Sequence, residues 1–373
     1  MRSKVYYHAS DHFTHRLESF FEARHKGLES DFMSSPSVNP TGSLVAGQNE
    51  SPSAASATAS CPICDRPAPG AALEKRGNYS LFSCPQCALH FWNPRLLPTS
   101  EWYELMYSGR DAKLLPLEPG HKYFLSDPNA PQSGDLLDVG CGTGNFLVAA
   151  RDKSFRVSGT ELDRSAASFA REKLSLENIF PFSIIDFVAE YPAAKFDVIT
   201  FFEVFEHQAD PAAFLRSVAS CLRPGGHIAL SVPNRDRWLT GPDVFDYPPN
   251  HFLRWNETAL RNVLQRFRFQ ILSIQQQPVD FPYAVSMINM ALRSGLTKKV
   301  TGREGVFFSD LMQMDAAEAI AVIREAPSAR QRLMSAFGRV KRGLCYPLAG
   351  AALPYLRMRG YKAAYLYCLA RLA

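Results

Sequence analysis

The 373 residues contain no long apolar run, no block of like charges and no internal repeat, and these absences narrow what the chain can do. No stretch reaches the roughly 18 consecutive apolar residues that a membrane-spanning helix requires. The best candidate, residues 344–356, is short and flanked by arginines, which leaves two interpretations open: a packed helix, or contact with a membrane surface. No run of five lysines and arginines occurs and the net charge is only +5, so a nucleic-acid partner is not expected.

The first residues, MRSKVYYHASDHF, lack the apolar core of a secretory signal peptide. Eight cysteines are present, and four of them are scattered along the chain: Cys141, Cys221, Cys345 and Cys368. A reducing compartment is the default without an export signal, so we expect a cytoplasmic protein without disulfides.

The chain divides by composition into four parts. Residues 1–57 are rich in Ser, Ala, Pro and Gly and poor in large apolar side chains, so we expect a disordered extension. Residues 58–98 form a compact unit around paired cysteines, and residues 99–133 form a connector with a helix opened by Ser100. Residues 134–373 carry most of the apolar sequence and should form the main domain.

Short apolar runs alternate with helical patterns from residue 134 to 280, which predicts a parallel sheet covered by helices on both faces. The third predicted strand is FSIID, residues 182–186. Residues 281–360 are predicted to be mostly helical, with breaks at Gly295, Pro327 and Gly343, and residues 363–371 to form a final strand that covers the sheet edge.

A glycine-rich turn, LLDVGCGTGNF, follows the first of these strands. Its glycines, Gly140, Gly142 and Gly144, allow a sharp turn and a close approach of the backbone to a ligand. A dinucleotide fingerprint would need a glycine where Asn145 stands, and no Gly-Lys-Ser/Thr triplet of a triphosphate-binding loop is present. The turn therefore predicts a nucleotide-like ligand but lacks both phosphate-binding signatures.

A second acid, Glu161, ends the next strand in SGTELD, 23 positions after Asp138. An acid at this place can accept hydrogen bonds from both ribose hydroxyls of a nucleoside. The alternative is a solvated acid at a strand end. The spacing and strand order favour a nucleoside ligand without phosphates.

With these residues the sequence resembles the class I S-adenosylmethionine-dependent methyltransferases. The resemblance covers residues 134–280 and rests on LLDVGCGTGNFL, VSGTELD, FDVITFFEVFEH and LRPGGHIALSVPN in this order. It implies an α/β, Rossmann-like sheet of seven strands whose last strand is antiparallel. Residues 281–360 then become a helical insertion before that strand, and S-adenosylmethionine the cofactor.

The resemblance also implies roles for individual positions. The cofactor-binding set would be Asp138, Gly140, Gly142, Gly144, Glu161, Asp186, Phe187 and Glu203. The glycines would line the methionine and ribose part, Asp138 would stand near the amino group, and Glu161 would hold the ribose hydroxyls. Asp186 and Phe187, after the third strand, would flank the adenine. Glu203, at the end of the fourth strand, would border the methyl-transfer cavity.

Two CxxC pairs, in CPICD and SCPQC, are separated by 19 residues. This spacing predicts a structural zinc ion held by four thiolates, Cys61, Cys64, Cys84 and Cys87. Four cysteines leave no open coordination position, so a catalytic zinc is not expected, and His90 is superfluous as a ligand. A redox dithiol would need only one such pair.

A zinc ribbon before such a domain resembles bacterial enzymes that methylate sugars and other small metabolites, including deoxysugar C-methyltransferases. This looser resemblance rests on CPICD, FSCPQCALHFWNPR and WYELMYSG. It implies that Tyr103 and Tyr107 stand on the substrate side, with packing on a helix face as the alternative.

Two histidines follow strands at the carboxyl side of the sheet: His207 in EVFEHQADP and His251 in DYPPNHFLRW. A reference pKa of about 6.5 suits either as a general base near neutral pH. We predict His251 first and His207 second as catalytic bases, with Tyr247 and Glu206 as further candidates. Helix capping or loop tethering is the structural alternative for both histidines.

The sequence thus predicts a methyltransferase that acts on a small-molecule acceptor, such as a sugar or another metabolite. The alternative is a nucleic-acid-directed methyltransferase or binder that uses the zinc ribbon. It would require a basic stripe with exposed aromatics in the ribbon, and the ribbon has only a thin excess of basic residues. A non-catalytic cofactor-binding scaffold is a third hypothesis, which the intact glycine turn disfavours. The methylated atom and the oligomeric state stay open.

Overall fold

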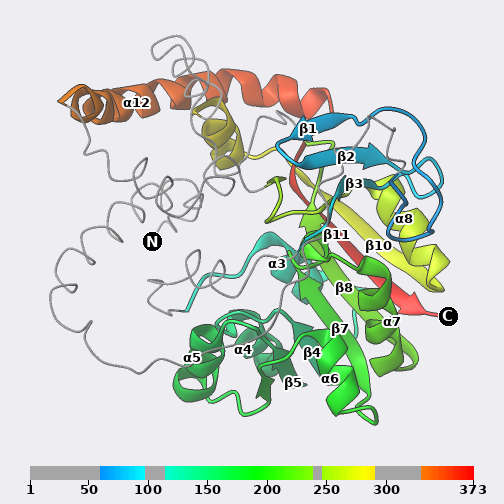
Figure 1. The fold of residues 1–373 in the computed structure, drawn as a ribbon. Helices are drawn as coiled ribbons and strands as arrows, with labels where there is room; N and C mark the ends of the chain where they lie inside the picture. Colours follow the sequence, from blue (N-terminus) through cyan, green and yellow to red (C-terminus); the bar gives the residue numbers. More distant parts are fainter. Residues whose placement is uncertain (1–58, 97–113, 238–245, 290–328) are drawn as a thin grey trace, which may run out of the picture. The chain divides into compact units, whose positions relative to one another are not determined.

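The protein was analysed as a computed structural model (Figure 1), which describes residues 59–96, 114–237, 246–289 and 329–373. Several predictions concern residues outside these ranges: the disordered extension, the connector residues Ser100, Tyr103 and Tyr107, and the helix breaks at Gly295 and Pro327. Residues 58–373 form one compact unit.

A seven-stranded sheet forms the centre of this unit, in the order β10-β11-β8-β7-β4-β5-β6. Its strands are β4 Gly134–Val139, β5 Phe155–Thr160, β6 Ile179–Phe180, β7 Phe196–Phe202, β8 Leu222–Pro233, β10 Phe269–Pro278 and β11 Lys362–Leu372. The pairs among β4 to β8 are parallel, whereas β11 runs antiparallel to both of its neighbours. The predicted Rossmann-like sheet with a late antiparallel strand is confirmed.

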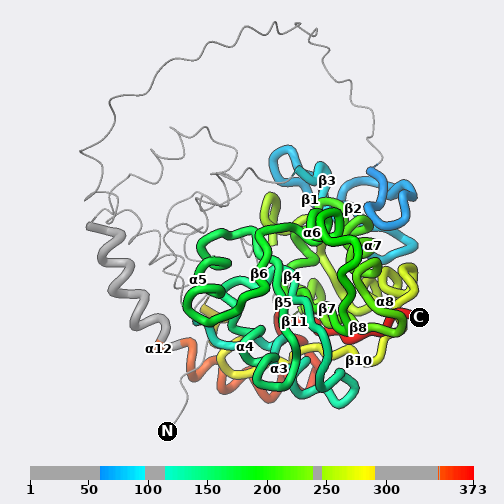
Figure 2. Tube along the Cα trace, turned by 90° about the horizontal axis from the view of Figure 1, so that it is seen from below, coloured from blue at the N-terminus to red at the C-terminus, as the bar shows by residue number. Residues whose placement is uncertain are grey.

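Helices cover both faces of the sheet, as predicted (Figure 2). They are α3 Pro119–Ser126, α4 Asn145–Asp152, α5 Arg164–Leu174, α6 Ile184–Glu190, α7 Pro211–Cys221 and α8 Glu257–Arg266. Leu136 of β4 packs with α3, α4 and α5, whereas the adjacent Leu137 packs with α6, α7 and α8. This alternation of buried side chains places the two layers of core on opposite faces.

The predicted third strand, residues 182–186, is wrong. The strand at this place is the two-residue β6, and Ser183 instead begins helix α6 by accepting a hydrogen bond from the Asp186 amide at 3.1 Å. Ile184 and Phe187, three residues apart, then face the core together. A short apolar run fits a buried strand or a buried helix equally well, and the N-cap serine decides for the helix.

The described parts of the insertion before β11 are helical, as predicted. Residues 281–289 form one helix, and α12 spans Ala329–Met358. The predicted break at Gly343 is wrong, because α12 continues through this residue. Of the two interpretations for 344–356, the helix is found: Cys345, Ala349 and Leu356 are buried, and other apolar side chains are exposed. No described helix is long and apolar enough to cross a membrane.

The cysteine-containing unit carries a second sheet of β1 Glu74–Arg76, β2 Tyr79–Ser83, β3 His90–Asn93 and β9 Leu253–Arg254. Strand β9 comes from the main domain and pairs antiparallel with β3. The Trp92 amide extends this pairing by donating to the Phe252 carbonyl at 2.8 Å. The unit that the sequence suggests is separate therefore shares a sheet with the segment that follows His251.

Candidate functional site

The glycine turn after β4 has three left-handed glycines, with φ of 74° at Gly140, 55° at Gly142 and 81° at Gly144. An added Cβ would lie 2.7 Å from the side chain of Val204 at the first and 2.5 Å from that of Leu176 at the third. At Gly142 nothing lies within 4 Å. The outer two glycines are thus required for packing, and the middle one borders open space that suits a ligand.

Glu161 is fixed against this turn. Its Oε2 accepts a hydrogen bond from the Gly142 amide at 2.8 Å, and its Oε1 accepts one from the Asp163 amide at 2.7 Å. Burial raises the pKa of Glu161, and these amides oppose that shift. The neighbouring Thr143 hydroxyl is buried without a hydrogen-bond partner in the described part of the chain. An orphaned polar atom beside the turn is what a missing polar ligand would leave.

Asp138 lies at the end of β4 and is only 3% exposed. Its Oδ1 accepts a hydrogen bond from the Thr200 hydroxyl at 2.6 Å. Burial, with a smaller contribution from the charge of Glu161, raises the pKa of Asp138 to about 8. A cationic ligand group beside this carboxyl would favour its ionised form.

The adenine-flanking pair does not fit as implied. Phe187 is buried in the core, with its ring centroid 5.2 Å from that of Phe180, so its ring is not free to cover a base. Asp186 lies in the first turn of α6 and accepts a hydrogen bond from the Ser183 hydroxyl at 2.6 Å. The error follows from the misplaced third strand, because the residues directly after β6 are 181–183.

Glu203 follows β7 in a left-handed conformation, with φ of 54°. A non-glycine residue in this region costs about 1–3 kcal/mol and persists only where its surroundings hold it. Ser231 holds it here: the Glu203 amide donates to the Ser231 carbonyl at 2.9 Å, and the Ser231 hydroxyl donates to Glu203 Oε1 at 2.8 Å. Burial raises the pKa of Glu203 to about 8.

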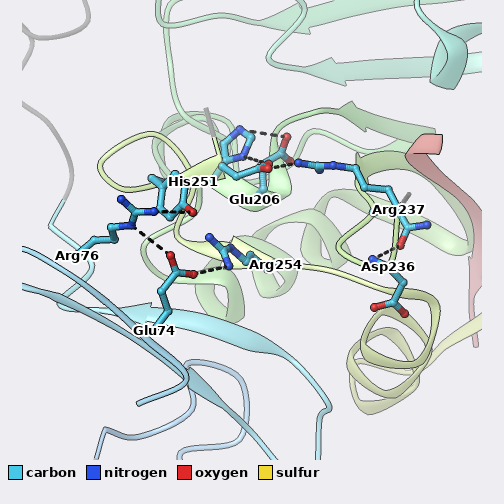
Figure 3. A network of polar contacts seen from close by, with 10 residues as sticks. Glu74, Arg76, Glu206, Asp236, Arg237, His251 and Arg254 are labelled. Carbon is cyan, nitrogen blue, oxygen red and sulfur yellow. Dashed lines mark hydrogen bonds and ion pairs between the residues drawn. The ribbon is translucent and has the colours of Figure 1, made fainter. Parts of the chain in front are cut away.

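The two candidate bases meet around Glu206, a buried acid in the short helix η1, Phe205–His207. Figure 3 shows His251 beside Glu206. Nε2 of His207 and Nε2 of His251 each lie 3.9 Å from Glu206 Oε1. The two imidazole rings are perpendicular, with centroids 4.7 Å apart. The sequence could not indicate this convergence, because 43 residues separate the histidines.

The outer nitrogens of both rings have oxygen partners. Nδ1 of His207 lies 2.6 Å from the Asn250 carbonyl, and Nδ1 of His251 lies 3.6 Å from Asp246 Oδ1. Burial lowers the pKa of His207 to about 3, helped by the charge of His251. Burial opposes ionisation of Asp246, yet His251 and Arg237 lower its pKa to about 2. Neither Asp246 nor Arg237 was a candidate from the sequence.

Side chains of the second sheet contact the segment around His251 (Figure 3). Glu74 of β1 accepts from Arg254 at 3.1 Å, and Arg76 donates to the Tyr247 hydroxyl at 3.3 Å. The guanidinium carbons of Arg76 and Arg254 lie 4.6 and 5.0 Å from the centroid of the Tyr247 ring. Two cation–π contacts and a hydrogen bond thus hold the Tyr247 ring in place, and its role as a base stays a prediction.

Cys61, Cys64, Cys84 and Cys87 are all buried, with their sulfur atoms within 4.8 Å of one another. The Cys64 and Cys84 sulfurs are 3.6 Å apart. Ligands at about 2.3 Å around a tetrahedral zinc ion lie about 3.8 Å apart. The arrangement therefore fits the ion that the spacing predicts.

Residues 114–274 match the protein family described as "Methyltransferase domain". The match runs from the segment before α3 into β10 and includes the glycine turn, Glu161 and Glu206. This segment is a class I S-adenosylmethionine-dependent methyltransferase domain.

Relatives of the methyltransferase domain include the "Ubiquinone biosynthesis O-methyltransferase" of Idiomarina loihiensis, 36% identical over 112 residues, which are 28% of this chain and 46% of that protein. A "Probable S-adenosylmethionine-dependent methyltransferase" of Mycolicibacterium smegmatis is 30% identical over 137 residues, 37% of this chain and 52% of that protein. The chain spans about half the length of these curated relatives.

A solved structure of a putative sarcosine dimethylglycine methyltransferase from Galdieria sulphuraria has a TM-score of 0.41 and 16% identity. The aligned region covers 73% of this chain and 97% of the Galdieria chain.

Proposed function

We propose that the protein transfers a methyl group from S-adenosylmethionine to a small-molecule acceptor, a sugar or another metabolite. The observation that carries the proposal is the Glu161 carboxylate, bonded to the Gly142 amide where the turn borders open space. The names of the ubiquinone O-methyltransferase relatives favour a hydroxyl group as the acceptor.

The residues of the site suit this chemistry through positioning. When bound, S-adenosylmethionine supplies a methyl group on a cationic sulfur. The turn and Glu161 would hold the nucleoside, and the buried Asp138 would face the positive charge of the methionine part. Aligning the acceptor beside the methyl group supplies most of the rate gain in such a reaction.

The acceptor must lose a proton as its bond to the methyl carbon forms and the carbon–sulfur bond breaks. His251 is our first candidate to accept this proton and His207 the second, because both lie in loops after strands of the domain. A base in this position contributes about 10²- to 10⁴-fold to the rate.

We also propose that the four cysteines hold one structural zinc ion. The burial and mutual distances of the cysteines support this proposal. The ion would stabilise the second sheet, which pairs with the segment after His251. A cytoplasmic location follows from the cysteine usage and stays a prediction.

Calorimetry with S-adenosylhomocysteine tests the cofactor site. We expect the wild-type chain to bind and Glu161→Ala to bind about 10- to 100-fold more weakly, because hydrogen bonds of a charged group are lost. The matched control is Glu177→Ala, an exposed acid, which should bind as the wild type does. A folded wild-type protein that binds no S-adenosylhomocysteine would refute the proposal.

Transfer of labelled methyl groups to cell extracts tests the acceptor class. The label should appear in the small-molecule fraction. Label in the nucleic-acid fraction would instead support the nucleic-acid-directed alternative.

A further inference from the structure

We infer that Glu206, His207 and His251 form a binding site for a divalent transition-metal ion, distinct from the four-cysteine site. Their ligand atoms, one carboxylate oxygen and two imidazole nitrogens, all lie within 4.8 Å of one another. Glu206 and His207 lie in η1, and His251 lies in the loop before β9. A hydrogen bond joins these two segments: the Phe252 amide donates to the Glu206 carbonyl at 2.9 Å.

The hydrogen positions on the two rings carry the first part of the inference. The Asn250 carbonyl can only accept, so His207 must donate from Nδ1. Nδ1 of His251 faces the side chain of Asp246, which is paired with Arg237. Nδ1 of both rings is thus turned toward an oxygen atom, whereas Nε2 of both rings faces Glu206 Oε1 at 3.9 Å. A cation between these three atoms is a partner that all of them would bind.

The isolation of Glu206 carries the second part. This side chain is 1% exposed, and neither of its oxygens has a hydrogen-bond partner within the described ranges. A buried carboxyl in that state loses its hydration without replacement. Arg237 lies in an ion pair with Asp246, and a divalent ion would supply the partner that the Glu206 oxygens lack.

The surroundings of the histidines are those of metal ligands. In such sites the second ring nitrogen usually donates to a carboxylate or a backbone carbonyl, which fixes the ring and its tautomer. His251 has the carboxylate of Asp246 and His207 has the carbonyl of Asn250. Arg237 in turn fixes Asp246 through an ion pair, so the orientation of the ligands is built into the fold.

Two imidazoles and one carboxylate are the ligands of catalytic zinc and of other first-row divalent ions with open positions. Bonds of about 2.0–2.1 Å around a tetrahedral ion separate ligands by about 3.4 Å. The two carboxylate–imidazole separations of 3.9 Å would close by about half an ångström, and all three ligand atoms already lie within 4.8 Å of one another. Unlike the four-cysteine site, three ligands leave at least one position for an acceptor or water.

An ion here would act on the acceptor. A hydroxyl group bound to such an ion would release its proton to solvent water more readily, and its oxygen would then take the methyl group as the carbon–sulfur bond breaks. His251 would then be a ligand rather than the general base. This use rests on the proposed function, whereas the binding of the ion does not.

Cobalt(II) titration of the full chain tests the site, with the four-cysteine site first filled with zinc. We expect a second metal ion per chain, with the weak visible bands of nitrogen and oxygen ligands and no sulfur charge-transfer band. Glu206→Gln and His251→Gln should weaken this binding by at least about 100-fold. Asp246→Asn should weaken it by about 10- to 100-fold, the usual effect of an outer partner.

The matched control is His227→Gln, a half-buried histidine on β8, which should bind cobalt as the wild type does. Circular dichroism verifies that each variant is folded. A folded wild-type chain that takes up only the zinc of the cysteine site overturns the inference, as does a second cobalt ion that survives both ligand substitutions. S-adenosylhomocysteine binding is measured in parallel, so a failed cofactor site and a failed metal site give different results.

Discussion

The glycine turn and the histidine cluster follow β4 and β7, two neighbouring strands, but they are assembled in different ways. The turn is local: three glycines lie within five residues, and Glu161 comes from the end of the adjacent β5. The histidine cluster combines η1, the loop before β9 and, through the pairing of β3 with β9, the cysteine-containing unit. The turn, on the proposed cofactor side, thus depends on short stretches after neighbouring strands, whereas the histidine cluster, on the proposed acceptor side, depends on tertiary contacts.

Removing the proposed zinc should give the largest effect and should damage the two sides unequally. Cys84→Ser should lower the free energy of unfolding by on the order of 5 kcal/mol, because structural zinc binding contributes directly to folding. The β9 segment should lose protection from hydrogen exchange while the glycine turn keeps it. Cys221→Ala, at the buried end of α7, is the control. Equal loss of protection in both segments would break the comparison.

Truncating Trp255 should come next. This fully buried ring stacks on Phe205 of η1, with centroids 4.5 Å apart and an interplanar angle of 18°. Trp255→Ala should cost about 3–5 kcal/mol in urea unfolding. Phe146→Ala, an equally buried ring under the glycine turn, should cost a similar amount. Only the tryptophan variant should disturb the NMR resonances of His207 and His251, whereas the Phe146 variant should disturb those of His121, on which Phe146 stacks. Disturbance of His207 and His251 in both variants would contradict the separation.

Asp138→Asn probes the cofactor side through pH. The folded-state pKa of about 8 lies above the ordinary 3.8, so the folded protein binds a proton that the unfolded chain releases between these values. Stability from this group is present below pH 3.8 and is lost as the pH rises toward 8. Relative to the variant, the wild type should lose up to about 1.4 kcal/mol per pH unit in this window. Parallel stability profiles from urea unfolding would contradict the raised pKa.

The smallest effects are expected at ion pairs within each of the two sheets. Arg254→Ala removes a half-buried ion pair with Glu74 and a cation–π contact with Tyr247, and should cost about 1 kcal/mol. Arg156→Ala breaks an ion pair of an arginine whose side chain is 75% exposed, and should cost less than about 0.5 kcal/mol. Thermal unfolding of both variants would reveal whether the order holds.

The difference between local patterns and tertiary contacts also explains which parts of the fold and site could be predicted from the sequence. The glycine turn, Glu161 and the strand order are contiguous patterns, and the late antiparallel β11 followed from the resemblance. The prediction of a third strand at residues 182–186 was wrong because Ser183 caps a helix there, although the apolar run also fits a strand. Strand β9 has two residues, too few for any pattern, and Arg237 and Asp246 acquire their roles only from the fold. The meeting of His207 and His251 likewise requires the three-dimensional structure.

The left-handed backbone of Glu203 has a consequence for engineering. Glu203→Gly would release about 1 kcal/mol or more of backbone strain, so a screen for thermal stability would tend to select that change. The same change would delete the carboxyl that borders the proposed reaction space. At position 203, selection for thermal stability would therefore favour glycine, whereas selection for turnover would favour glutamate.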